Sequence, residues 1–277
     1  ANTLLSTLTK DVYGNSTLIV RDGAELTIDG STHVSNTFGE VWVMPSGKIT
    51  VPSDKRLTVS SLNLQGGIEE VYDGSTYTTE KYRVPQLSLK GALYRNSSAL
   101  ATVTYYQRTD AEQMYMFGVP SAVNFSDIKY ADGTAATPGT DFYAETYNGA
   151  RRATGVIGGN WIYEESFANE RLDRGTGYWF AAEVRDGQTY ALMKMPLTVN
   201  ESADQSVDVT YYGSDAAVAD IHKGWNFIAN PYMVTIEPTH LVGNDGSEHT
   251  YDYVTIPDEA HYQNSFYDQY YVAEGVL

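Results

Sequence analysis

The side chains best suited to contact a ligand are the tryptophans and tyrosines of short, strand-like runs. Trp161 and Tyr163 stand two residues apart, and Trp42, Trp179 and Trp225 lie in similar runs. Alternate residues of a β-strand point to the same face of its sheet. A ring at a surface offers a flat apolar face and, in tyrosine, a polar tip, which suits protein or sugar partners. Such rings also fill β-protein cores. Trp161 and Tyr163 are the preferred candidates for an exposed ligand-binding platform, with core packing as the open alternative.

The carboxylates are numerous, but their spacing does not indicate a catalytic pair. Two acidic side chains perform acid–base catalysis only where the fold brings both to one cleft. The adjacent pairs Glu69-Glu70 and Glu164-Glu165 would point to opposite faces of a strand, which indicates surface solvation. A β-helical lyase or hydrolase would need more coils than this sequence contains to build a sugar-binding groove. We therefore predict that the chain is not an enzyme and has no catalytic residues.

Metal-binding patterns are weak. No two of the five histidines have the i, i+4 spacing of a helical zinc site; they are His33, His222, His240, His249 and His261. The absence of cysteine excludes a disulfide framework, a thiol nucleophile and Cys-based metal centres. The run 244–248 carries oxygen ligands but lacks the full spacing of an EF-hand loop. We predict no cofactor and no metal ligand, with calcium binding as the open alternative.

Composition excludes several classes of partner. The chain has 277 residues, with 18 basic and 35 acidic side chains and a net charge of −17. Affinity for nucleic acid comes from Lys and Arg that displace counterions, so no nucleic acid partner is expected. The apolar runs are far too short to span a bilayer, so no membrane insertion is expected. Hydrophobic residues make up 42% of the chain, enough for extensive cores, and the abundance of Tyr, Thr and Val favours sheet.

The first third of the chain contains an internal repeat with a spacing of 23 residues. The runs of the first copy are 18–20 and 26–28, those of the second are 41–43 and 49–51, and partial copies are 57–59, 62–64 and 87–89. Apolar residues at both ends of each run give the period of two that is typical of strands. Short strands repeated at roughly this period are typical of a β-solenoid. We predict a short right-handed β-solenoid in residues 1–97, with a plain β-meander as the alternative.

Beyond residue 97 the repeat ends, and short strand-like runs follow. The expected strands are 101–107, 114–119, 142–147, 160–163, 178–184, 189–193, 207–212 and 225–229. Pairs that favour type I′ hairpin turns occur at Asp132-Gly133, Asn148-Gly149, Asp186-Gly187 and Asp245-Gly246. The clearest predicted hairpin covers residues 184–190. The predicted fold class is all-β, in which an antiparallel β-sandwich of residues 98–277 follows the solenoid.

One segment resembles a known group of proteins. Residues 224–232 read Gly-Trp-Asn-Phe-Ile-Ala-Asn-Pro-Tyr, which is similar to the GWN…NPY segment of large secreted proteins of Bacteroidetes. Residues 117–151, beginning Phe-Gly-Val-Pro, resemble the other half of that module, and the repeat resembles the β-helical stretches before it. The resemblance spans residues 18–277. It implies a cell-surface or secreted setting and an adhesion or scaffold role, and it brings no catalytic residues.

These patterns predict a non-catalytic adhesion or structural module that binds through sheet faces and loops. Its partner would be a protein or a glycan at the surface of a bacterium, and its location extracellular or on the outer-membrane surface. The alternative function is a carbohydrate-binding module that uses exposed aromatic residues. Residues 1–10 lack a basic region followed by an apolar core, so any signal peptide is expected to have been removed. The ligand, the oligomeric state and membership of a longer chain stay open.

Overall fold

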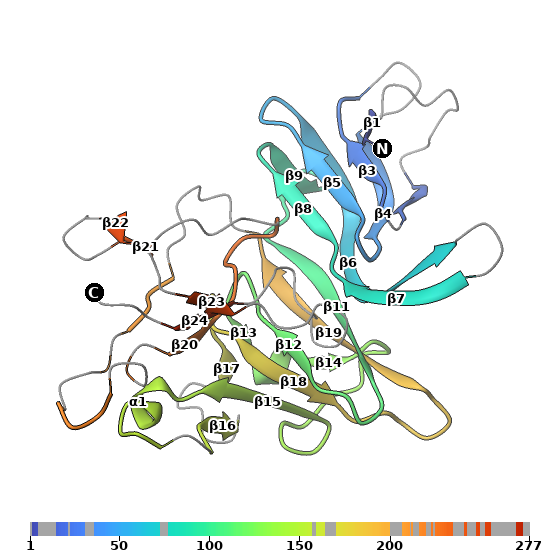
Figure 1. Cartoon of the computed structure of the whole chain (residues 1–277). Helices are drawn as coiled ribbons and strands as arrows, with labels where there is room; N and C mark the ends of the chain where they lie inside the picture. The colour runs from blue at the N-terminus through green and yellow to red at the C-terminus, as the bar shows by residue number, and fades with distance from the viewer. Residues whose placement is uncertain are drawn as a thin grey trace.

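The regular structure of the described residues consists almost entirely of β-strands (Figure 1), which confirms the all-β prediction. The structure is a computed structural model that describes residues 2–4, 15–21, 23–30, 36–72, 77–156, 159–163, 170–199, 207–210, 212, 216–219, 223, 225–234, 241–242, 248–249, 253–255 and 270–273. Within these residues the helical segments are a 3-10 turn, η2 (Phe125–Asp127), and a four-residue helix, α1 (Gly149–Arg152).

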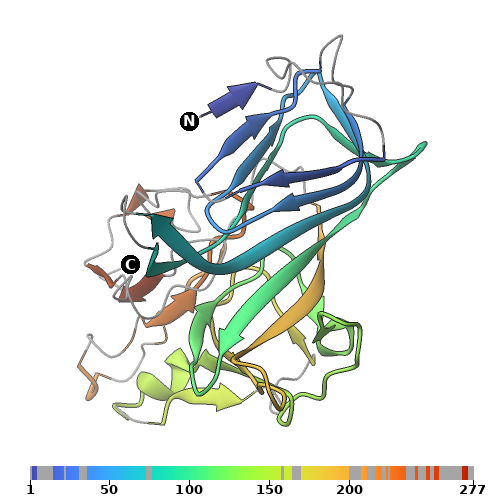
Figure 2. The same cartoon turned by 90° about the vertical axis from the view of Figure 1, so that its right-hand side faces the viewer.

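The first third of the chain forms two layers of parallel strands (Figure 2). One layer contains, in spatial order, β1 (Asn2–Leu4), β3 (Glu25–Thr27), β5 (Lys48–Val51) and β8 (Gln86–Leu89). The other contains β2 (Thr17–Val20), β4 (Thr37–Val43), β6 (Arg56–Tyr72) and β9 (Ala92–Arg95). The chain therefore alternates between the two layers as it advances.

The 23-residue spacing of the sequence is the register in which these strands pair. Ile19 lies beside Trp42 in one layer, and Leu26 lies beside Ile49 in the other. The partial copies differ from the prediction, because 57–59 and 62–64 belong to the single 17-residue strand β6. The position beside β5 is taken instead by β8, where Leu87 pairs with Ile49. Between β6 and β8 the chain forms β7 (Tyr77–Arg83), which pairs antiparallel with the end of β6.

Alternation of apolar and polar residues gives the two layers a common core. In β4 and β6 the inward side chains include Val41, Val43 and Leu64, which are fully buried. Ile49 and Val51 of β5 are equally buried and belong to the same apolar cluster. Branched side chains of this kind pack well on a pleated surface, and each buried one stabilises the fold by about 1.5–3 kcal/mol. The outward residues of the same strands stay accessible.

The second layer continues without a break into the rest of the chain. Its further strands are β10 (Ser98–Ala99), β11 (Thr102–Asp110), β14 (Lys129–Tyr130) and β19 (Tyr190–Thr198). β11 pairs in parallel with β6, where Tyr105 lies beside Leu64, and antiparallel with β19 along nine residues. Hydrogen bonding therefore crosses residue 97, and both predicted domains contribute to one nine-stranded sheet. The domain boundary itself stays a prediction.

A four-stranded antiparallel sheet packs on the second part of this large sheet. Its strands are, in spatial order, β12 (Tyr115–Phe117), β18 (Tyr178–Ala182), β15 (Phe142–Tyr147) and β16 (Trp161–Tyr163). Aromatic side chains fill the space between the sheets. The ring centroids of Tyr105 and Phe117 are 6.2 Å apart, and those of Phe117 and Phe180 are 5.1 Å apart. These rings join the two sheets into one core.

Two predicted hairpins are wrong. Residues 184–190 do not join paired strands, because β18 belongs to the four-stranded sheet and β19 to the nine-stranded one. Gly187 still has the positive φ, 81°, that such turns require. Asn148 caps helix α1, where its side-chain oxygen accepts a hydrogen bond from the Arg151 backbone N–H. Asn is among the preferred N-cap residues, and capping competes with its use in a tight turn.

Several short strands complete the fold. They are β13 (Val123–Asn124), β17 (Arg171–Leu172), β20 (Asn226–Ile228), β21 (Leu241–Val242), β22 (Glu248–His249), β23 (Tyr253–Thr255) and β24 (Tyr270–Ala273). β20 lies within the run predicted at 225–229. The run predicted at 207–212 is wrong as far as the structure describes it, because residues 207–210 form no strand.

Candidate functional site

Trp161 and Tyr163 lie on β16, at the edge of the four-stranded sheet, and point to the same face of it. Tyr147 pairs with Trp161 and Glu145 with Tyr163 across the β15–β16 ladder. This face is opposite the one that carries the buried rings of Phe142 and Phe180. The shared face follows from the two-residue spacing, as the sequence predicted.

The two residues differ in how far they reach solvent. Trp161 is half-buried, and its ring makes edge contacts with Tyr147, Trp179 and Phe227 at centroid distances of 5.2, 6.0 and 5.5 Å. Tyr163 is 51% exposed. Trp161 therefore anchors β16 within an aromatic cluster, and Tyr163 is the member of the pair that a ligand reaches most easily. A binding role for both residues stays a prediction.

Tyr163 borders an open groove of about 520 Å³, which we call the Tyr163 groove. Tyr143 and Met114 supply further apolar surface, and Met114 is 36% exposed. Three carboxylates line the same space, those of Glu112, Glu145 and Glu183. The groove thus combines a flat ring with several acceptors of hydrogen bonds from hydroxyl groups.

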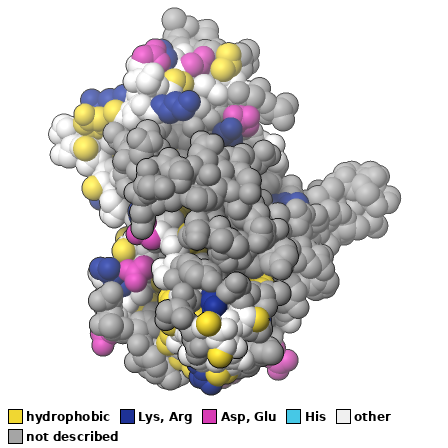
Figure 3. Space-filling model, turned by 60° about the vertical axis from the view of Figure 1, so that its left-hand side comes forward, with side chains coloured by type: hydrophobic (Ala, Val, Ile, Leu, Met, Phe, Trp, Pro, Cys, Tyr) yellow, Lys and Arg dark blue, Asp and Glu magenta, His cyan; other side chains and the backbone are white. Residues whose placement is uncertain are grey.

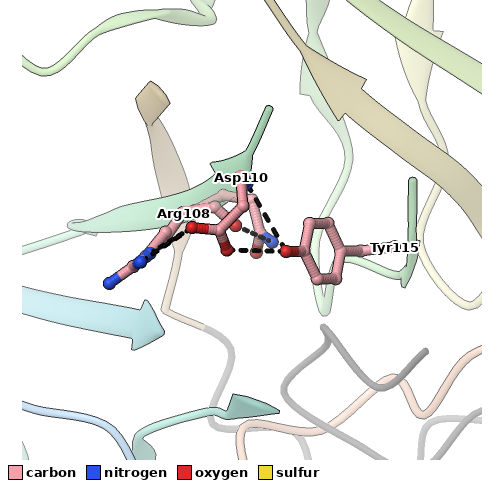
Figure 4. Close-up of polar contacts among 4 residues, drawn as sticks. Arg108, Asp110 and Tyr115 are labelled. Carbon is pink, nitrogen blue, oxygen red and sulfur yellow. Dashed lines mark hydrogen bonds and ion pairs between the residues drawn. The ribbon is translucent and has the colours of Figure 1, made fainter. Parts of the chain in front are cut away.

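The wall formed by residues 111–114 is a turn that passes from the large sheet to the small one. Side chains at its two ends hold it in place (Figure 4). The Tyr115 hydroxyl donates a hydrogen bond of 2.7 Å to Asp110 Oδ2. Arg108 donates from Nη2 to Asp110 Oδ1 at 2.7 Å, and its guanidinium lies 4.2 Å from the centre of the Tyr190 ring. Charge-assisted hydrogen bonds of this type are stronger than neutral ones, so the turn is firmly positioned.

Burial and the neighbouring carboxylate keep Tyr115 in its donor form. Desolvation raises the pKa of Tyr115 well above its ordinary value, and its hydrogen bond to Asp110 and the Asp110 charge raise the pKa further. The hydroxyl therefore keeps its proton at physiological pH. Glu112, at the tip of the turn, has a backbone φ of 59°, a value that residues other than Gly rarely adopt. The held ends impose this conformation and direct the carboxylate of Glu112 to the groove.

The opposite wall of the groove is formed by the beginning of the connection 183–189. Contacts on the side of this connection that faces away from the groove hold it in place. Arg185 lies 3.6 Å from the centre of the Tyr130 ring and donates a 2.7 Å hydrogen bond to Asp132 Oδ2. The pKa of Asp132 is lowered to about 2, first by the backbone N–H of Thr134 and then by Arg185. Both walls of the Tyr163 groove are therefore connections between the two sheets; Tyr115–Asp110 joins the ends of the first, and Arg185–Asp132 ties the second to residue 132.

Sequence reasoning missed Met114, Tyr143, Glu145 and the two other carboxylates of the groove. Tyr143 and Glu145 do alternate in a run that was predicted as a strand. Their neighbours could not be predicted, because the order of strands in the sheet is set by long-range pairing. The turn 111–114 carried no signal of its own.

The metal predictions fall mostly on residues that the structure does not describe. His33, His222, His240, His261 and residues 244–247 lie outside the described residues, as do Glu164 and Glu165. Across the part of the chain that is described, no group of three or more His, Cys, Asp or Glu side chains could hold a metal ion. The three carboxylates of the Tyr163 groove therefore do not form such a group.

Comparisons with protein-family models, with curated proteins and with solved structures find no match to this chain. No helix within the described residues is long and apolar enough to cross a membrane. On the face that Figure 3 presents, apolar, basic and acidic side chains of the described residues are interspersed. The grooves and the residues that line them are therefore the features of the described chain that point to a function.

Proposed function

We propose that this chain is a non-catalytic adhesion or structural module, secreted or held at a bacterial surface, which binds its partner through sheet faces and loops. The observation that carries the proposal is the Tyr163 groove, where the exposed ring of Tyr163 lies between two connections held by Tyr115–Asp110 and Arg185–Asp132. Preorganised walls reduce the entropy that binding costs. Such a site suits recognition of a partner that arrives from solution.

The finer fold that we propose is a short solenoid followed by a sandwich. Parallel pairing at a 23-residue register supports the solenoid. The contact of Tyr105 with Phe117, between two sheets, supports the sandwich. In this proposal the solenoid acts as a spacer that holds the sandwich away from the bacterial surface.

The segment that resembles the Bacteroidetes proteins supplies structure rather than chemistry. Asn226 accepts a 2.9 Å hydrogen bond from the Thr210 backbone N–H and donates a 3.0 Å bond to the Thr210 carbonyl. The buried Asn230 likewise donates to the Val234 carbonyl and accepts from the Tyr232 backbone N–H. Both Asn side chains thus hold neighbouring backbone in place. On the resemblance of this segment alone, we propose a bacterial surface setting for this chain.

A second candidate function is carbohydrate binding, which the lining of the Tyr163 groove favours. A tyrosine ring offers an apolar face to the C–H groups of a sugar ring. The carboxylates of Glu112, Glu145 and Glu183 would accept hydrogen bonds from sugar hydroxyls. Because these three groups are negative, the ligand would be a neutral sugar.

Binding of purified protein to immobilised neutral glycans and to immobilised extracellular-matrix proteins tests both candidates. Loss of the Tyr163 ring in Tyr163→Ala should weaken binding about tenfold, equivalent to about 1.4 kcal/mol. Tyr163→Phe keeps the ring and is the matched control. Trp161→Ala is less specific, because Trp161 packs against three other rings.

Retention of matrix proteins would support adhesion, and retention of neutral glycans would support carbohydrate binding. If the wild type binds neither, or if Tyr163→Ala binds equally well, the proposal for this groove is wrong. Turnover of any bound polymer would contradict the non-catalytic role.

A further inference from the structure

A second groove lies on the outer face of the nine-stranded sheet, in the part that the parallel strands form. It has a volume of about 400 Å³, and we call it the Trp42 groove. β2 and the residue that follows it supply Thr17, Ile19 and Arg21 to the lining. β4 and the residue that follows it supply Trp42 and Met44, and β6 supplies Gln65. Ile19 is 50% exposed, and Arg21 is exposed.

The register of the parallel strands brings these side chains together. Ile19 pairs with Trp42, and Trp42 pairs with Asn63, two residues before Gln65. The intervening residues Val41 and Val43 are fully buried on the inner face. Since strand residues alternate between faces, Trp42 and Gln65 are directed outward. The groove is therefore a product of the 23-residue repeat.

The indole of Trp42 is held in one orientation. Its ring centroid lies 5.1 Å from that of Tyr106 on β11, with an angle of 35° between the planes. Its Nε1 donates a 3.3 Å hydrogen bond to Glu40 Oε2, and Glu40 is not part of the groove lining. A ring fixed in this way loses little freedom when a ligand stacks on it.

Two polar side chains of the groove are available to a ligand. Within the described residues, neither the guanidinium of Arg21 nor the half-buried amide of Gln65 has a hydrogen-bond or ion-pair partner. Among the described residues that line the groove, Arg21 is the only charged one. A cation that has no partner among the described residues, in a chain of net charge −17, marks a position suited to an anion. A guanidinium binds a carboxylate through two parallel hydrogen bonds.

We propose that the Trp42 groove binds an acidic glycan, a sugar that carries a carboxylate. Trp42 stacks on the sugar ring, Arg21 pairs with the carboxylate, and Gln65 bonds the hydroxyls. An acidic peptide is less suited, because β4 and β6, which carry Trp42 and Gln65, are paired on both sides, so a peptide strand could add only to the outer edge of β2, away from Trp42 and Gln65. This inference goes beyond the proposed function and does not depend on the Tyr163 groove, which lies on the other side of the core.

Isothermal titration with matched acidic and neutral probes tests the inference on the full chain. The acidic probes are 3′-sialyllactose, a galacturonate hexamer and a hyaluronan hexamer, and the neutral ones are lactose and the carboxyl-reduced hexamers. We expect at least one acidic probe to bind about tenfold or more tightly than its neutral counterpart. Tryptophan fluorescence should change on binding, since the sugar contacts Trp42.

Variants assign the binding to the groove. Arg21→Gln, at an exposed position, and Trp42→Ala should each weaken binding of the acidic probe about tenfold or more. Trp42→Phe keeps a ring and should retain most of the affinity, and Tyr163→Ala should have no effect. Circular dichroism and urea unfolding establish that each variant is folded. Should Trp42→Ala fail to fold, Arg21→Gln still decides the test.

The inference is wrong if no acidic probe binds, if the neutral probes bind equally well, or if Arg21→Gln leaves the affinity unchanged. Tighter binding of an oligoglutamate peptide than of every sugar would also overturn it, in favour of a protein partner. Because Tyr163→Ala tests the other groove separately, failure at one site is distinguishable from failure at the other.

Discussion

The Tyr163 groove and the Trp42 groove both present an aromatic ring to solvent, but they differ in charge. Of the residues that the structure describes, three carboxylates line the first groove, whereas Arg21 is the only charged residue that lines the second. The rings stand on strands in both cases. In the Tyr163 groove, Glu112 and Glu183 come from the connections between sheets, whereas Gln65 of the Trp42 groove stands on β6 itself. Similar sheet surfaces can therefore select different ligands through the polar groups beside the ring.

The two grooves also share one support. β6 supplies Gln65 to the Trp42 groove, and its neighbour β11 leads directly into the turn 111–114 of the Tyr163 groove. Local changes in a groove wall should affect one site, and changes in the sheet between them should affect both. The predictions below separate these cases.

The largest effect is expected for Gly66→Ala, which should damage both grooves. A Cβ at Gly66 would overlap the hydroxyl of Tyr105, and that hydroxyl donates a 2.7 Å hydrogen bond to Gln107 inside the core. Overpacking of this kind should lower the free energy of unfolding by about 3 kcal/mol. Urea unfolding measures the change. The same substitution in a Tyr105→Phe background should cost less, because the overlapping oxygen is gone; an equal cost would contradict the explanation.

A smaller effect, confined to the Tyr163 groove, is expected for Tyr115→Phe. The change removes the hydrogen bond to Asp110 Oδ2 and should lower the free energy of unfolding by about 1–2 kcal/mol. Amides of residues 111–114 should exchange hydrogen faster, while binding at the Trp42 groove stays unchanged. Tyr190→Phe is the control, because it removes a hydroxyl that has no hydrogen bond within the described residues. Equal effects of both variants would show that the Tyr115–Asp110 contact does not hold the turn.

The smallest effect is expected for the pH dependence of stability that comes from Asp132, the partner of Arg185 in the other wall of the Tyr163 groove. The pKa of Asp132 is lowered to about 2 in the folded chain, below the value of about 3.9 for an unfolded chain. Its contribution to stability is therefore fully present above about pH 4 and is lost as the pH falls towards 2. Urea midpoints at pH 5 and pH 2.5 should differ less in Asp132→Asn than in the wild type. An equal difference between the two pH values in both proteins would contradict the prediction.

The sequence was most informative where contacts are local. Apolar residues in alternation, together with many Tyr, Thr and Val, predicted an all-β chain. The 23-residue spacing predicted which residues lie side by side, and Ile19 does pair with Trp42. These features follow from the geometry of single strands and of one repeat, which a short stretch of sequence contains.

It was least informative where distant segments meet. The Asp186-Gly187 pair was read as a hairpin turn, but the flanking strands pair with partners far away in the sequence. Trp161 and Tyr163 were correctly placed on one face, whereas Phe227, which packs on Trp161, comes from a segment far along the chain. Arg21 and Gln65 were not singled out, because the role proposed for them depends on their having no partner among the described residues, and pairing of this kind is visible only in the folded chain.

The length of β6 has a consequence for how this protein can be divided. Residues 63–66 of β6 pair with β11, which begins after the predicted boundary at residue 97. A fragment that ends there would expose this row of backbone N–H and C=O groups along one edge of the strand. Unpaired edges recruit other strands, so the isolated first part would self-associate through that edge. The second part would lose the template on which its longest antiparallel ladder assembles.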